Sequence, residues 1–253
     1  MINVRDQKLG KRPARFDKRT LKLCDYLTAP APPPAVSWLN NLKTWPMYAN
    51  DQLGDCVEAA SGHMVDLWAS YTKPTEPVLS TSQIIAAYSG ATGYVPGDPS
   101  TDNGTNILAF LKYWRNTGIG GHKIAGFVGL TPGSLIELRQ SVWLFGAPMI
   151  GLQLPVTAQG ASSWTVPDSL TGDGAPGSWG GHCVPPAKYD VSLPARERNT
   201  VITWGQLMPM SDYFYQIYSD EAYAVLSLDW FNKVSEAPNN FNLKALQADL
   251  AAL

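Results

Sequence analysis

The order in which helical and strand-like patterns follow one another is the feature that most limits the fold of this chain. Up to residue 145, apolar side chains recur mainly at helical spacing, and from residue 146 onward short buried runs with strand character take over. We expect helices at 55–71, 80–88, 106–116 and 133–145, a shorter helix at 18–26, and strands at 149–154, 182–189, 200–204 and 222–228. Helices and strands that are segregated in this way predict an α+β body with two packed lobes.

The composition agrees with a globular body. The chain has 253 residues, of which 45% are hydrophobic and 16% charged, so it is long enough to bury a core in one domain of two lobes. No apolar run approaches the roughly 20 residues that cross a bilayer, and the first residues contain no apolar signal core. We therefore expect no membrane partner and no secretory signal.

Three segments follow from the distribution of proline, charge and leucine. Residues 1–35 form a basic arm that ends in the proline-rich linker APAPPPA, and residues 36–235 form the body. Residues 236–253 are expected to form a C-terminal helix, with Leu243, Leu246, Leu250 and Leu253 on one face. That apolar stripe would pack on the body or bind a partner helix.

The charge of the arm is opposite to that of the body. Residues 1–23 carry a net charge of +6 and the rest of the chain −8, which gives the total of −2. The arm is therefore expected to lie across the acidic surface of its own body or to contact an acidic partner. The proline linker favours a different arrangement, in which a spacer holds the arm away from the body for assembly into a homo-oligomer or with another protein. The arm has no interleaved aromatic residues, so nucleic acid is an unlikely partner.

The three cysteines, Cys24, Cys56 and Cys183, cannot all pair within one chain. No spacing among them matches a metal site or a redox pair, so we expect neither a metal nor another cofactor. The sparse, odd set fits a reducing compartment or a fold that keeps one thiol free for chemistry.

Cys56 is the best candidate for that thiol. It follows Asp55, a good N-cap residue, and stands in the first turn of a predicted helix, where the helix dipole favours thiolate over thiol. The competing interpretation is a small buried apolar side chain.

The partner base must come from another part of the chain. His63 lies about 10 Å further along the same predicted helix, and His122 stands in a turn. His182 follows Gly180 and Gly181 and opens an apolar strand, and glycines allow another backbone or a substrate to approach closely. A cysteine activated by a histidine far away in sequence is a known nucleophile arrangement, so Cys56 and His182 are the predicted pair.

Seven short segments then follow one another in an order that resembles the landmarks of the papain-like cysteine peptidases. They are PAVSW at 34–38, NDQLGDCVEAA at 50–60, LSTSQIIAAY at 79–88, DNGTNILAFLKYWRNTGI at 102–119, GAPMIGLQL at 146–154, GGHC at 180–183 and TWG at 203–205. The resemblance implies a papain-like two-lobed fold, with a helical left lobe that carries the cysteine helix and a strand-rich right lobe. The LGDC and TWG forms are also similar to papain-like proteins of phages and prophages, which implies a cytoplasmic or virion-associated location.

The resemblance assigns roles position by position. Cys56 would be the nucleophile and His182 the base. The oxyanion amide would be Gln52 by motif or Asn50 by distance from the cysteine. The substrate cleft would be lined by Asn103, Gly104 and Gly181, and Trp204 would cover the contact that orients the histidine.

Two departures from the family pattern stand near His182. Ile202 occupies the position of the orienting asparagine, and Thr203 is expected on the opposite strand face unless a β-bulge turns it. Two prolines, Pro185 and Pro186, interrupt the strand that follows the histidine.

The function predicted on this basis is a thiol hydrolase, a cysteine peptidase that acts on peptide or isopeptide bonds of a peptide or protein substrate. The alternative is a catalytically weak or inactive papain-like scaffold used for binding or assembly, for example as a phage particle component. In the family, the segment ahead of the mature start is a propeptide that occupies the cleft. Residues 1–33 stand in that position, although they are too short for the usual helical pro-domain.

Overall fold

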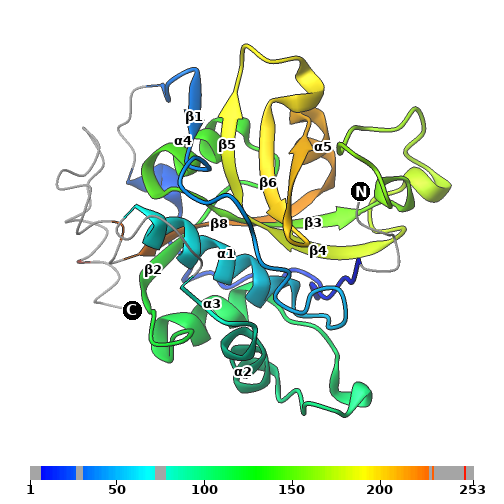
Figure 1. Ribbon diagram of the computed structural model, residues 1–253. Coiled ribbons are helices and arrows are strands. Elements are labelled where there is room, and N and C mark those ends of the chain that lie inside the picture. Colours follow the sequence, from blue (N-terminus) through cyan, green and yellow to red (C-terminus); the bar gives the residue numbers. More distant parts are fainter. Residues whose placement is uncertain (1–6, 27–30, 72–77, 228–229, 231–247, 249–253) are drawn as a thin grey trace.

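Two four-stranded antiparallel sheets and a group of helices make up the described part of the chain (Figure 1). The structure is a computed structural model that describes residues 7–26, 31–71, 78–227, 230 and 248. One sheet has the strand order β1-β5-β6-β7 and the other the order β2-β8-β3-β4. The sheets and the helices α1 to α3 lie in different parts of the molecule, which confirms the α+β architecture with two lobes.

The first four described α-helices begin and end within a few residues of the expected positions, and the fifth was not expected. They are α1 (Cys56–Ser70), α2 (Thr81–Thr92), α3 (Ile107–Asn116), α4 (Leu135–Phe145) and α5 (Asp212–Tyr218). Ser80 caps α2 in a capping box with Gln83, and Asn106, Ser134 and Ser211 cap the following helices through their side chains. Asp55 occupies the N-cap position of α1, but its side chain makes no capping hydrogen bond, so that part of the expectation is wrong.

The described strands are β1 (Ala35–Ser37), β2 (Ile124–Gly129), β3 (Met149–Leu154), β4 (Gly180–Val184), β5 (Pro186–Asp190), β6 (Asn199–Thr203), β7 (Gln206–Met210) and β8 (Ser219–Ser227). The strand expected at 182–189 is in fact two strands that belong to different sheets, because Pro185 has no N–H to continue the ladder. The sequence did not predict β1, β2, β7 or α5. The helix expected at 18–26 is only a short 3-10 turn at Leu23–Asp25.

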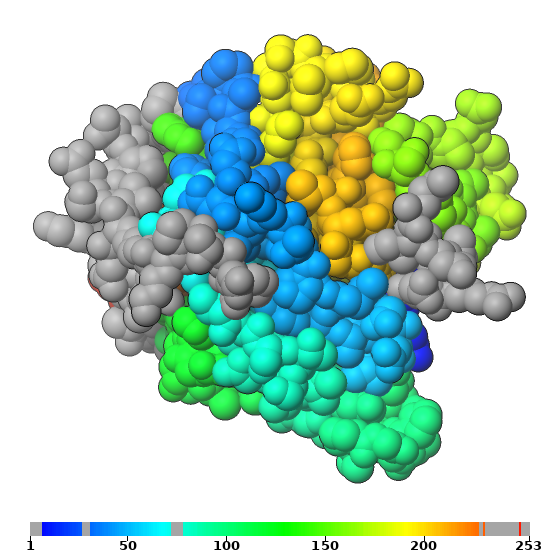
Figure 2. All heavy atoms as spheres, viewed as in Figure 1, coloured from blue at the N-terminus to red at the C-terminus, as the bar shows by residue number. Residues whose placement is uncertain are grey.

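The buried apolar residues form two clusters. One lies between the helices and the sheets and contains Cys56, Trp114 and Cys183, and the other fills the strand-rich lobe around Trp164, Trp204 and Phe214. Because α1 packs against β4, the segments that carry Cys56 and His182 are neighbours at the boundary between the lobes. On the face seen in Figure 2, residues 38–55, coloured blue to light blue, cover part of this boundary.

The N-terminal arm lies against the body. Residues 7–26 follow the boundary between the lobes, and parallel bridges join Lys11 to Thr105 and Lys22 to Gly129 (Figure 1). Ion pairs link the arm to acidic and basic side chains of the body, as the opposite charges predict. The expectation that the proline linker holds the arm away from the body is therefore wrong for these residues.

Two expectations concern regions of which little is described. The leucine stripe 243–253 lies outside the described residues. Within the described ranges, none of the helices combines the length and apolar character that crossing a membrane requires.

Candidate active site

Cys56 is the first residue of α1 and lies at the boundary between the lobes. The backbone N–H groups of Cys183 and of Gly10 in the arm point at its sulfur and stabilise the thiolate. Burial outweighs both contacts and raises the pKa of the Cys56 thiol to about 12. The expectation that the helix dipole makes Cys56 a thiolate near neutral pH is therefore wrong for the conformation with the arm in place.

Two carboxyl groups are buried beside the cysteine. Burial raises the pKa values of Asp55 and Glu58 well above their usual range. Glu58 accepts a hydrogen bond of 2.8 Å from the Thr105 hydroxyl through Oε1, while Oε2 has no partner in the described part of the chain. The Asn50 amide lies near Asp55 and weakly favours its charged form, although neither carboxyl oxygen has a hydrogen bond of regular geometry. Burial therefore favours the neutral form of both groups in this conformation.

His182 lies in β4 and is fixed from two sides. Its Nε2 is 2.7 Å from the Thr203 hydroxyl oxygen, and its ring stacks on the Trp204 indole with centroids 4.2 Å apart. Burial lowers the pKa of His182 to about 3, so the imidazole is neutral at ordinary pH. Nδ1 is also buried and has no hydrogen-bond partner among the described residues.

Thr203 is the side chain that orients the histidine, contrary to the expectation that it points to the opposite face. It is the last residue of β6 and pairs with Gln206 across a two-residue turn. The turn residues Trp204 and Gly205 have φ angles of +44° and +68°, which is the conformation of a type I′ hairpin turn. Ile202, at the position of the family asparagine, packs instead in the same apolar cluster as Cys56.

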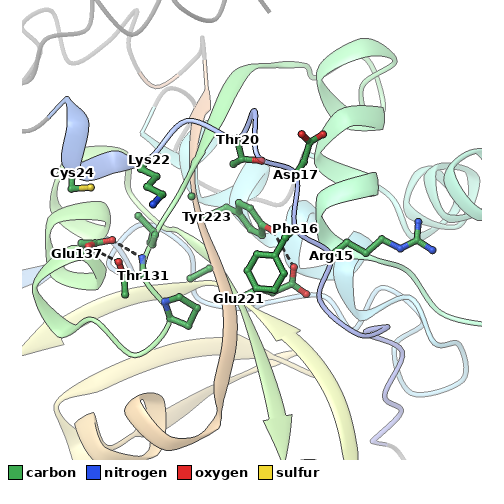
Figure 3. Close-up of a pocket in the computed structure, with 14 residues that line it drawn as sticks. Arg15, Phe16, Asp17, Thr20, Lys22, Cys24, Thr131, Glu137, Glu221 and Tyr223 are labelled. Atoms are coloured by element: carbon green, nitrogen blue, oxygen red, sulfur yellow. Dashed lines mark hydrogen bonds between the residues drawn. The ribbon is translucent and has the colours of Figure 1, made fainter.

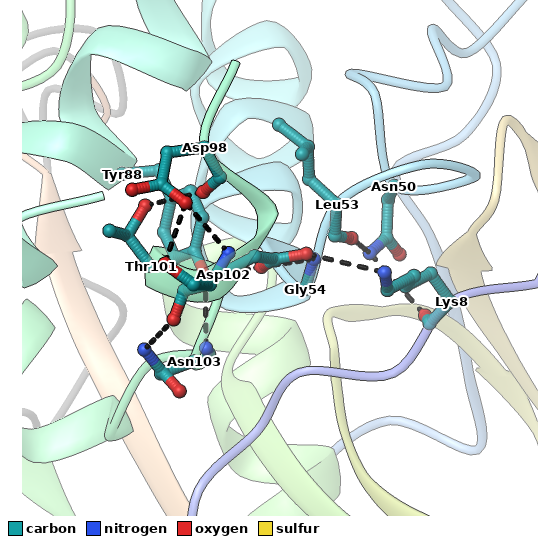
Figure 4. Close-up of polar contacts among 11 residues, drawn as sticks. Lys8, Asn50, Leu53, Gly54, Tyr88, Asp98, Thr101, Asp102 and Asn103 are labelled. Atoms are coloured by element: carbon teal, nitrogen blue, oxygen red, sulfur yellow. Dashed lines mark hydrogen bonds and ion pairs between the residues drawn. The ribbon is translucent and has the colours of Figure 1, made fainter. Parts of the chain in front are cut away.

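The two candidate oxyanion amides have different surroundings. Asn50 is buried, and its Nδ2 faces the backbone oxygens of Leu53 and of Lys8 in the arm, at 3.2 and 3.4 Å. Figure 4 shows this amide directed toward Lys8. Gln52 is exposed and contacts the carboxylate of Asp51. Asn50, rather than Gln52, therefore lies beside the bound segment.

A second group of contacts holds the turn before the cysteine. The Asp102 carboxylate accepts hydrogen bonds from the Gly54 backbone N–H and the Tyr88 hydroxyl and makes an ion pair of 3.3 Å with Lys8 (Figure 4). The Asn103 side chain donates to the Ser100 carbonyl and is exposed. The sequence did not single out Asp102, since an isolated aspartate in a polar loop has no distinctive spacing.

Gly104 and Gly181 make room for the arm. A Cβ on Gly104 would lie 2.0 Å from the Gly10 oxygen, and one on Gly181 would lie 2.3 Å from the Lys11 oxygen. Gly10 itself is equally constrained, because its Cβ would lie 1.8 Å from the Gly54 oxygen. The arm and the body are thus in contact through glycines on both sides, and these glycines let the two main chains approach each other closely.

The arm is bound in this cleft as an extended strand. The Lys8 N–H donates to the Asn50 oxygen, the Lys11 N–H to the Gly181 oxygen and the Arg12 N–H to the Thr105 oxygen. In return, the Thr105 N–H donates to the Gly10 oxygen, and the Trp204 indole N–H donates to the Lys8 oxygen. Both lobes therefore bind the same short segment.

The arm passes Cys56 at Gly10. The Gly10 N–H favours the thiolate of Cys56, and the Gly10 carbonyl accepts a hydrogen bond from the Thr105 N–H. The arm therefore occupies the cleft beside the sulfur, with the Gly10 carbonyl held by Thr105.

Comparisons with known proteins agree at the level of the fold. No family model matches the sequence, and no curated protein matches it. Among solved structures, xylellain, a cysteine protease from Xylella fastidiosa, aligns with a TM-score of 0.66 at 14% identity over 88% of this chain and 97% of its own. Digestive procathepsin L2 from Tenebrio molitor aligns with a TM-score of 0.60 at 11% identity, over 88% of this chain and 79% of its own.

Procathepsin B S9 from Trypanosoma congolense is a third similar structure, with a TM-score of 0.55 at 12% identity over 88% of this chain and 87% of its own. The identities of these three proteins are low, so the likeness concerns the fold and leaves activity to be argued from the site. The structural neighbours are papain-like cysteine proteases, and this chain has the papain-like fold.

Proposed function

We propose that this chain is a cysteine peptidase that hydrolyses peptide or isopeptide bonds with Cys56 as nucleophile and His182 as base. The observation that carries the proposal is the way in which the His182 ring is held. Thr203 and Trp204 fix its ring, while Nδ1 is buried next to the helix of Cys56 and has no hydrogen-bond partner in the described ranges of the chain. A nitrogen held in this way is suited to take a proton from the thiol.

The reaction would proceed in two steps. His182 Nδ1 accepts the Cys56 proton, and the thiolate adds to the substrate carbonyl. The C–N bond then breaks, and the amine leaves with the proton that His182 returns. Water, deprotonated by His182, attacks the thioester and releases the acid and the free thiol. During both additions the Asn50 amide and the Cys56 backbone N–H would stabilise the oxyanion.

For Nδ1 to accept that proton, Nε2 must carry the other hydrogen and donate it to the Thr203 hydroxyl oxygen. The Thr203 hydroxyl stands one residue after the position of the family asparagine, and it can accept this hydrogen bond as an amide oxygen does. Trp204 covers the contact and excludes water from it.

The test is labelling of the full-length chain with a peptidyl epoxide, followed by mapping of the modified residue. We expect an adduct on Cys56, no adduct in Cys56→Ala, and labelling at least about tenfold slower in His182→Ala. His122→Ala is the matched control, because His122 lies in the turn before β2, and it should label like the wild type. Equal modification of Cys24, Cys56 and Cys183 would contradict the proposal.

The second candidate is a scaffold without activity, and the buried, protonated thiol is the observation in its favour. A scaffold needs no accessible sulfur. If Cys56 resists the epoxide even after the arm has been displaced, this second function is the better account of the site.

A further inference from the structure

The side chain of Lys11 is the most deeply buried cationic group of the arm. It has no solvent-exposed surface, although it belongs to a segment in which Arg12, Arg15, Lys18 and Arg19 are exposed. Its Nζ lies 2.7 Å from Asp220 Oδ2 and 3.1 Å from Glu221 Oε1, and it also donates to the Arg12 oxygen. A lysine buried so completely needs a site built for it, since an unpaired buried ammonium group is strongly unfavourable.

The body supplies that site from three neighbouring strands of one sheet. Gly151 in β3 leaves the space for the stem, because a Cβ there would lie 2.2 Å from the Lys11 Cε. Asp220 and Glu221 in β8 form the end of the pocket, and Gly181 in β4 forms its mouth by accepting the Lys11 backbone N–H. All of these contributions come from the paired strands β4, β3 and β8.

The two carboxylates are held by the body itself. Gln153 donates a hydrogen bond of 2.6 Å to Asp220, and the Tyr223 hydroxyl donates one of 3.2 Å to Glu221. Figure 3 shows Glu221 and Tyr223 together beside Phe16 of the arm, where they also line a cavity of about 340 Å³. The pocket is therefore not formed by Lys11 and would keep its acidic end when the arm leaves.

The pocket lies within one residue of the reacting sulfur. The Gly10 N–H favours the thiolate of Cys56, and Lys11 is the next residue of the same bound segment. Cys183 packs in the same apolar cluster as Cys56, and its backbone N–H contacts that sulfur. Whatever occupies the pocket is thus placed beside the bond that the site would cut.

We propose that the pocket formed by Gly151, Asp220 and Glu221 is a subsite for a lysine side chain of the substrate, and that Lys11 occupies it in the resting chain. The inference rests on the proposed peptidase function and specifies its substrate class as polypeptides with lysine next to the cleaved bond. A neutral side chain of the same length leaves both acidic groups without a cation in the pocket, and an acidic side chain adds a like charge.

The experiment uses full-length protein and a set of peptidyl epoxides. Lysine, norleucine or glutamate is placed in turn at each of the three residues next to the epoxide, and the rate of Cys56 modification is measured by mass spectrometry. Lys11→Met withdraws the ammonium group of the arm from the pocket, and Lys18→Met is the matched control, because Lys18 is an exposed lysine of the same arm.

We expect the lysine probe to react at least about tenfold faster than the norleucine probe at one position, with glutamate slowest. Lys11→Met should raise the rate with the lysine probe, and Lys18→Met should leave it unchanged. Adding Asp220→Asn and Glu221→Gln to Lys11→Met should bring the lysine and norleucine rates within about threefold of each other.

The wild type measured in parallel covers the case in which Lys11→Met fails to fold. In the wild type every probe must first displace the arm, which slows all probes by the same factor. The ratio of the labelling rates with the lysine and norleucine probes is therefore the same as in a chain with an empty cleft. Labelling of Cys56 with equal rates for lysine and norleucine at every position would overturn the subsite while leaving the peptidase proposal intact. Absence of any labelling that depends on Cys56 and His182 would overturn the peptidase proposal, and the subsite with it.

Discussion

Replacement of Gly10 by valine in the full-length chain is the sharpest test of how the arm controls Cys56. A Cβ at this position would lie 1.8 Å from the Gly54 backbone oxygen, and backbone cannot yield as a flexible side chain does. The variant therefore expels the segment around Gly10 from the cleft and leaves every residue of the body unchanged. Phe16→Ala is the matched control, because Phe16 is 91% exposed in the same arm.

The expected increase in the alkylation rate of Cys56 follows from the pKa of its thiol. The arm-covered thiol has a pKa of about 12, against an ordinary value of 9.0. Restoring the ordinary value raises the thiolate population near neutral pH about a thousandfold. A less basic thiolate is a weaker nucleophile, by a factor of about 30 for a Brønsted coefficient near 0.5. The net gain in the alkylation rate is therefore about 30-fold, and direct access to the sulfur adds to it.

The assay is the rate of Cys56 carbamidomethylation by iodoacetamide between pH 7 and pH 11. In the wild type the rate should rise about tenfold per pH unit over this whole range, because the thiol pKa lies above it. In Gly10→Val the rate should level off near pH 9 or below. Identical profiles for the wild type and Gly10→Val would refute the conclusion that the arm keeps Cys56 protonated.

Three further predictions concern other parts of the structure. In the Gly10→Val background, Thr203→Val should slow epoxide labelling of Cys56 about tenfold, because Nε2 loses its partner, while Thr203→Ser should keep the rate near that of the parent. Glu58→Gln should stabilise the fold more as the pH rises, by up to about 1.4 kcal/mol per pH unit above 4.5. The reason is that burial raises the pKa of Glu58 in the folded wild type, so above pH 4.5 the unfolded wild type releases a proton that the folded wild type keeps, and the wild type loses stability as the pH rises. Melting temperatures of the variant and the wild type at pH 4.5, 6 and 8 check this. A difference in melting temperature that does not change with pH would contradict it. Gly62→Ala should destabilise the fold by about 1–3 kcal/mol in chemical denaturation, because its Cβ would lie 2.7 Å from Ile84 and 2.8 Å from Tyr48; an unchanged midpoint would show that both side chains move aside.

The sequence predicted the framework of the site well, because the relevant signals are local. The apolar spacing behind Cys56 placed that residue at the start of α1, and the glycines before His182 placed the histidine in a strand, although β4 begins two residues earlier than expected. By contrast, β1, β2, β7 and α5 went unpredicted, since each is short and its pattern depends on partners far away in sequence.

The chemistry of individual groups was harder to predict. Position in a helix suggested a reactive thiolate at Cys56, but the sulfur is buried in the folded chain and burial raises its pKa. Strand alternation predicted that Thr203 points away unless a β-bulge turns it, whereas its hydroxyl contacts His182 at the end of β6, just before the turn at Trp204 and Gly205. The pocket for Lys11 combines Gly151 with two acids about 70 residues later, and no spacing in the sequence links them.

The arm is covalently attached to the site that it fills, and this changes how any ligand must compete. A tethered strand acts at an effective concentration that is in the millimolar range for short flexible connections and does not fall when the protein is diluted. A peptide that binds the empty cleft at micromolar concentration would therefore bind the intact chain only at far higher concentration. Cutting the chain between Arg12 and the body would turn this intramolecular competitor into a free peptide, which is lost on dilution. The fraction of clefts filled by the arm would then depend on protein concentration, which it does not in the intact chain.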